Sequence, residues 1–113
     1  MLQLWRHFYG ERPSGFSVAK LSKVLYLKRP ALYPILDSQL MRRYRRLARH
    51  QGQARPELGR YQYWSAVRED LMANTASGAL AQVREQLRTS SDPAIQAMSR
   101  LTDLRLLDIC TWR

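Results

Sequence analysis

The sequence predicts an all-α domain, and three observations support this fold class. Val and Ile are scarce, no alternating apolar–polar pattern runs for five residues, and apolar residues recur at helical spacing. A chain of 113 residues, of which 45% are hydrophobic, is long enough to bury about two-thirds of its unfolded surface. We therefore expect one compact domain over residues 1–113, built from five or six helices.

The first two helices are predicted from apolar spacing and from the residues that stop them. A short helix over residues 2–9 ends before Gly10. A second helix, over residues 16–27, follows Gly15 and ends near Pro30, because proline lacks a backbone donor and restricts the residue before it.

The central helix is predicted to begin at Asp37 and to end near His50. Residues 51–59 contain two glycines and a proline and are predicted to form the longest loop. The last helix starts with Asp92 as N-cap before a proline, and a break in it is expected near Thr102. The three helices expected after the loop cover residues 60–74, 78–88 and 93–112.

The positive charge of the chain is concentrated in its first sixty residues. Residues 1–60 contain thirteen Lys and Arg against three Asp and Glu, whereas residues 61–113 contain six of each. Self-repulsion within a positive cluster disfavours the compact state, so such a cluster usually faces an acidic partner. A nucleic-acid backbone is the commonest partner of this kind.

The helix that begins at Asp37 places an apolar stripe opposite a row of arginines. At 100° per residue, one 120° arc contains Leu40, Met41, Tyr44, Leu47 and Ala48. The opposite side carries what we call the arginine row: Arg42, Arg45, Arg46 and Arg49. A charged helix face is usually a solvated surface. No Asp or Glu is interleaved here to neutralise the arginines, however, so a phosphate-binding face is an equal alternative. The predicted nucleic-acid-binding residues are Lys20, Lys23, Lys28, Arg29 and the arginine row.

Residues 15–21 (Gly-Phe-Ser-Val-Ala-Lys-Leu) and 37–42 (Asp-Ser-Gln-Leu-Met-Arg) together resemble the helix-hairpin-helix DNA glycosylase superfamily. That superfamily has a Gly-hydrophobic-Gly hairpin and, a little over twenty residues later, a catalytic Asp. Gly15 and Asp37 are 22 positions apart, although Ser17 replaces the second glycine. The resemblance implies a degenerate helix-hairpin-helix around residues 14–49 that holds a DNA phosphate, and a catalytic role for Asp37 beside its N-cap role.

A second resemblance covers more of the chain. Residues 27–37 (Leu-Lys-Arg-Pro-Ala-Leu-Tyr-Pro-Ile-Leu-Asp) and 106–112 (Leu-Leu-Asp-Ile-Cys-Thr-Trp) are similar to signatures of an uncharacterised, mostly actinobacterial family. Because that family has no established activity, the resemblance implies a shared fold and no function.

Several other residues are candidates for a functional or structural role. Asp108 lies in an apolar run, where it is expected to pair with Lys23, Lys28 or Arg29, or to form a dyad with Asp37. Trp64 is predicted to lie in the core, while Tyr61 and Tyr63 could form an aromatic platform. The separated histidines suggest no metal site, and no cofactor is predicted.

The cellular location is inferred from cysteine usage and hydropathy. Cys110 is the only cysteine and is predicted to be a buried apolar residue, which favours a reducing cytoplasm. No apolar run approaches the ~18 residues of a membrane span, and no signal peptide is recognised.

Three functions are therefore expected in order of preference. The first is a helical domain that binds nucleic acid, DNA rather than RNA, through the arginine row. The second is a DNA glycosylase-like or other glycosidic enzyme that uses Asp37. The third is a protein–protein interaction module, such as a toxin, antitoxin or phage-defence component, whose basic face docks on an acidic protein.

Overall fold

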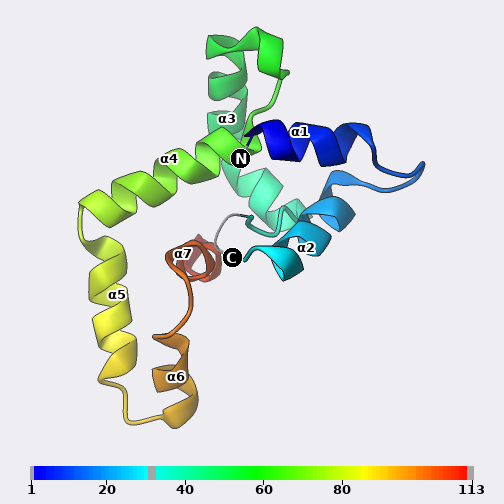
Figure 1. The fold of residues 1–113 in the computed structure, drawn as a ribbon. Helices are drawn as coiled ribbons and strands as arrows, with labels where there is room; N and C mark the ends of the chain where they lie inside the picture. Colours follow the sequence, from blue (N-terminus) through cyan, green and yellow to red (C-terminus); the bar gives the residue numbers. More distant parts are fainter. Residues whose placement is uncertain (1, 31–32, 112–113) are drawn as a thin grey trace.

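The computed structural model describes residues 2–30 and 33–111, so Ala31, Leu32 and Trp112 of the second signature lie outside the described residues (Figure 1). The described chain is helical and contains no β-strand, which confirms the all-α fold class. Its elements are α1 (Leu2–Gly10), α2 (Val18–Lys28), α3 (Ser38–Ala54), the 3-10 helix η1 (Pro56–Leu58), α4 (Tyr63–Ala76), α5 (Ala79–Arg88), α6 (Pro93–Met98) and α7 (Asp103–Thr111).

Helices α3 and α4 form the centre of the fold and pack against each other more extensively than any other pair (Figure 1). Helices α2 and α7 contribute apolar side chains to the same core. The apolar stripe of α3 is confirmed, since Leu40, Tyr44 and Ala48 are buried. Trp64 is buried as well, as predicted.

A buried serine fixes the segment that leads into α3. Ser22 on α2 is fully buried, and its Oγ donates to the carbonyl of Ala19 at 2.9 Å. The same Oγ accepts the backbone N–H of Leu36 at 3.0 Å. One residue later, Asp37 caps α3 and accepts the N–H of Leu40 at 2.8 Å. The hydroxyl of Ser22 therefore sets the point in space where α3 begins.

Helix α3 continues four residues beyond its predicted end. Gly52 was expected in a loop, but it is buried inside the helix, where the backbone of Arg60 lies against it. A Cβ at this position would lie 2.1 Å from the Arg60 carbonyl oxygen. The glycine therefore permits close approach of two backbones, and it does not end the helix.

The C-terminal half forms an arm and then returns to the core. Helices α5 and α6 extend away from the other helices, and α7 packs on α3, α4 and α5 (Figure 1). Asp92 caps α6 as predicted, and the expected break separates α6 from α7. Cys110 is exposed, so the prediction that it is buried was wrong: the apolar side of α7 is formed by Leu104 and its neighbours at helical spacing.

Candidate nucleic-acid interface and carboxylate cleft

The arginine row lies on the solvent side of α3. All four of its residues are exposed, as is Arg43 beside them. Among residues 2–30 and 33–111, ion pairs join Arg84 to Asp103, Arg88 to Glu85 and Arg105 to Asp108, and none involves α3. The cations of α3 therefore face solvent without a carboxylate from the described chain.

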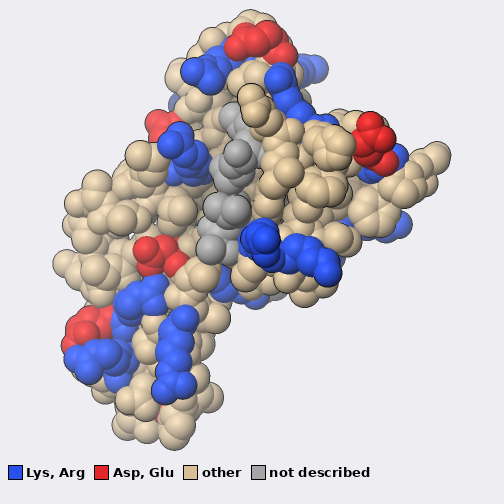
Figure 2. Space-filling view, in the orientation of Figure 1, with Lys and Arg blue, Asp and Glu red and all other residues tan. Residues whose placement is uncertain are grey.

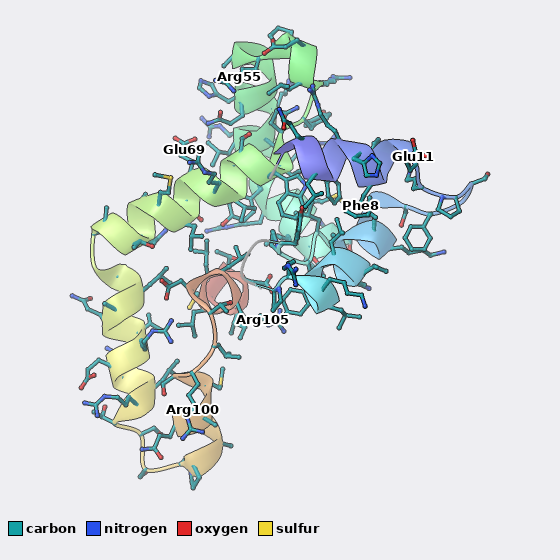
Figure 3. All side chains as sticks on the ribbon, viewed as in Figure 1. Phe8, Glu11, Arg55, Glu69, Arg100 and Arg105 are labelled. Atoms are coloured by element: carbon teal, nitrogen blue, oxygen red, sulfur yellow. The ribbon has the colours of Figure 1, made fainter. Side chains whose placement is uncertain are left out.

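Two acids of α4 that contact α3 are engaged with neutral partners. Glu69 accepts a hydrogen bond from the Gln51 side chain, and Figure 3 shows Glu69 on α4. Asp70 accepts from the Tyr44 hydroxyl and, at 2.9 Å, from Asn74. Both burial and the hydrogen bond to Asp70 raise the pKa of Tyr44. These acids hold α3 against α4 and leave the arginine row uncompensated.

The structure does not merge all of the predicted cations into one surface. Lys20, Lys23 and Lys28 are exposed on α2, and Arg29 is exposed at its C-cap; Lys23 also lines a cavity described below. On the face drawn in Figure 2, Lys and Arg side chains form separate groups with acidic groups between them. The candidate interface is therefore the α3 face, to which the α2 cations add charge from a second helix.

Asp37 and Asp108 line the same cavity, which we call the carboxylate cleft. This cavity of about 410 Å³ is lined by Lys23, Ile35, Asp37, Arg105, Asp108 and Ile109. Its walls come from α2, the segment before α3, and α7. The two acids, 71 positions apart in the sequence, are thus brought to one place by the packing of α7 beside the start of α3.

Asp108 is paired within its own helix. Arg105, one turn earlier on α7, donates to the Asp108 carboxylate, so the predicted pairing with Lys23, Lys28 or Arg29 was wrong. The Arg105 guanidinium also lies 5.7 Å from the centre of the Tyr26 ring, and Figure 3 shows Arg105 between α7 and α2. Burial raises the pKa of Asp108 against the opposing effect of Arg105, and the charge of Asp37 raises it further. A carboxyl group with a raised pKa is suited to donate a proton.

The aromatic residues around η1 form a third candidate surface. Tyr61 and Tyr63 are half-buried and stack with their ring centres 5.9 Å apart. The ring centre of Trp5 on α1 lies 4.8 Å from the ring centre of Trp64, so helix α1 forms part of this surface. Sequence reasoning named the tyrosines but missed Trp5, because nothing in the local pattern links residue 5 to residues 61–64.

Metal sites and membrane-spanning helices are two further classes of functional feature. Within ranges 2–30 and 33–111, no group of three or more His, Cys, Asp or Glu side chains is placed to hold a metal ion. In the same ranges, no helix combines the length and apolar character that crossing a bilayer requires.

Comparison with known proteins places the chain in a family. No curated protein and no solved structure matches it. One family model matches over residues 1–113, and it is described as "Family of unknown function (DUF6308)". The chain therefore belongs to this family of unknown function.

Proposed function

We propose that this protein binds duplex DNA through the arginine row of α3. The observation that carries the proposal is a row of four exposed arginines without a carboxylate partner in the described chain. From Arg42 to Arg49 the row spans about 10 Å of helix, and duplex DNA presents one phosphate charge per ~1.7 Å of axis. Counterion release by these guanidinium groups supplies the binding free energy.

Duplex DNA fits this surface better than duplex RNA. The major groove of B-DNA admits an α-helix, whereas the major groove of A-form RNA is deep and narrow. The C-terminal part of α3 stands out from the neighbouring helices in Figure 1. Gly15, with φ of +79°, and Ser17, which caps α2, support a second phosphate contact at the turn before α2, as a helix-hairpin-helix would make.

A salt titration of duplex binding tests this proposal. Replacing the four arginines of the row by Ala should reduce the slope of log affinity against log salt by up to about 3.6. The double variant Arg42→Ala/Arg46→Ala should lose about half of that amount. Its matched control, Arg88→Ala/Arg100→Ala, removes the same charge from α5 and the α6–α7 connection and should leave the slope unchanged.

Three results would contradict DNA binding through α3. The first is equal slopes for the two double variants, and the second is binding that ignores ionic strength. The third is stable co-purification with an acidic protein and no measurable duplex binding, which would favour the protein-interaction function instead.

The carboxylate cleft favours a second candidate function, cleavage of a glycosidic bond in nucleic acid or a nucleotide. Glycosidic hydrolysis uses two carboxyl groups: one protonates the leaving group, and the other stabilises positive charge on the sugar or activates water. Asp108, with its raised pKa, suits the first role, and Asp37 suits the second.

The variant Asp37→Asn tests the enzymatic candidate cleanly. Asn is as good an N-cap as Asp, so α3 should still form, while hydrolysis of damaged-base DNA should fall by at least about 100-fold. Asp92→Asn is the matched control, because the Asp92 side chain also caps a helix, α6, and is absent from the lining of the cleft. Full activity of Asp37→Asn, or equal losses in both variants, would dismiss the catalytic role.

A further inference from the structure

A groove lined by aromatic rings and arginines lies beside the arginine row. This cavity of about 420 Å³ is formed by α1, the segment before α3, the start of α3 and the segment after η1. We call it the aromatic groove and define it by Trp5, Arg6, Tyr9, Arg60, Tyr61 and Tyr63. Neither Asp nor Glu lines it among the described residues.

The rings of the groove are held in place and still present surface. Trp5 packs on the buried Trp64 and stacks with Tyr9 at 6.1 Å, with 24° between the planes. On the other side, Tyr61 and Tyr63 stack with 16° between their planes. Tyr9 is exposed, and Trp5, Tyr61 and Tyr63 are half-buried. The groove therefore offers ordered aromatic surfaces to a planar ligand.

Positive charge surrounds Tyr61 in particular. The guanidinium groups of Arg60 and Arg45 lie 5.4 Å and 5.9 Å from the centre of its ring. Hydrogen bonding from Arg45 lowers the pKa of Tyr61, and the charges of Arg60 and Arg49 act in the same direction. A ligand that enters this groove therefore meets two cations beside Tyr61.

Arg45 joins the groove to the arginine row, since it belongs to the row and also approaches Tyr61. A ligand that fits both features has flat rings and a backbone carrying negative charges at regular spacing. Single-stranded nucleic acid has this chemistry: its bases stack on aromatic side chains, and its phosphates follow a positively charged surface. The bases of an intact duplex are paired and stacked, so they would not enter the groove.

We infer that the aromatic groove binds an unpaired base of single-stranded DNA, such as a frayed end or a gap, while the flanking phosphates contact Arg45 and Arg60. This inference rests on the proposed DNA-binding function and adds a preference for single-stranded character to it. Tyr61 is the residue on which the base stacks, and Arg60 and Arg45 orient the phosphates on either side.

Two oligonucleotides of equal charge test the inference. One is a single-stranded thymidine oligonucleotide of about ten nucleotides, and the other is the same strand with abasic sugars in place of the bases. The protein should bind the thymidine strand roughly tenfold or more tightly than the abasic strand, because only the former has bases to stack. Equal affinities for the two strands would overturn the inference.

Variants of Tyr61 assign the preference to the groove. Tyr61→Ala should lower the affinity for the thymidine strand to that for the abasic strand, and Tyr61→Phe, which keeps the ring, should retain the preference. Tyr26→Ala is the matched control, because Tyr26 also lies under an arginine but is outside the groove. A preference that survives Tyr61→Ala would overturn the assignment.

Duplex binding separates this inference from the proposed function. Salt-dependent duplex binding without a preference for bases would overturn the inference and leave the proposed function intact. A preference for the thymidine strand, lost in Tyr61→Ala but without duplex binding through α3, would support the groove and contradict the duplex proposal. No binding to any nucleic acid would overturn both.

Discussion

Tyr33 and Tyr44 are both buried, but their hydroxyl groups have different surroundings. Tyr33 is 1% exposed, its ring meets Trp64 edge-on at 5.1 Å, and its hydroxyl has no hydrogen-bond partner among residues 2–30 and 33–111. Burial raises the pKa of Tyr33. Tyr44 is 5% exposed, but its hydroxyl donates to Asp70. The two residues therefore differ mainly in whether the buried hydroxyl is satisfied.

Replacing each tyrosine by Phe should have opposite consequences. Tyr33→Phe removes an unsatisfied buried hydroxyl and should leave the free energy of unfolding unchanged or raise it by up to about 1 kcal/mol. Tyr44→Phe takes a donor away from the Asp70 carboxylate and should lower the free energy of unfolding by about 1–3 kcal/mol. Urea denaturation of both variants at neutral pH measures their free energies of unfolding. An equal decrease in the two variants would contradict the prediction.

Residue patterns predicted some sites well and others not at all. The exposed row on α3 follows from the spacing of Arg42 and its partners, because the apolar residues opposite leave only one face for them. The position of Asp37 at a helix start follows from its preference for the N-cap. That Asp108 shares a cleft with Asp37 depends on how α7 packs, and no local pattern contains that information.

At the scale of elements, Gly52 decides how the segment after η1 lies on α3. The Arg60 carbonyl group contacts the helix at this glycine, and the N–H of Gln62 donates to the carbonyl of Ala48, one turn earlier on α3, at 2.9 Å. The contact places Arg60 and Tyr61 at the edge of the arginine row. Gly52 therefore helps to position Arg60 and Tyr61, two of the residues that line the aromatic groove.

Gly52→Ala should destabilise the protein despite the higher helix propensity of Ala. Ala favours a helix by about 1 kcal/mol over Gly, but its Cβ would overlap the carbonyl oxygen and carbon of Arg60 at 2.1 Å and 2.5 Å. We expect a net loss of about 1–3 kcal/mol and a weaker preference for the thymidine strand. Gly10→Ala is the control, since a Cβ there meets nothing within 4 Å and should be neutral or stabilising. Thermal denaturation of the two variants checks the contrast, and a stabilised Gly52→Ala would contradict it.

Element boundaries were predictable where one residue supplies a specific bond. Asp92 caps α6 through the N–H of Ala94 at 2.8 Å, and its sequence context was sufficient to predict this. The end of α3 was not predictable in this way. Gly52 reads as a helix terminator in isolation, and only the tertiary contact with Arg60 explains why the helix continues through it.

For the whole molecule, the net positive charge lies outside the arm formed by α5 and α6. The residues that carry the net charge of +10 belong to α1, α2, α3 and the segments that follow, which contain both the arginine row and the aromatic groove. The arm of α5 and α6 is nearly neutral and shares little of the core: Leu80 is the only buried residue described in α5, and α6 has none. The arm helps to give the molecule a longest dimension of 47 Å.

The arm should therefore open locally, and Arg84 should control the opening. Its guanidinium donates to the carbonyl groups of Ser99 and Leu101 and pairs with Asp103, so one side chain ties α5 to the α6–α7 connection. In hydrogen exchange followed by mass spectrometry, Arg84→Met should speed exchange in α6 and residues 99–102 and leave α3 unchanged, because few buried contacts otherwise oppose this opening. Arg88→Met should have little effect, since in the described part of the chain the Arg88 side chain pairs with Glu85 on its own helix at the surface. Faster exchange in α3 and the arm to the same extent would show instead that the whole chain unfolds as one cooperative unit.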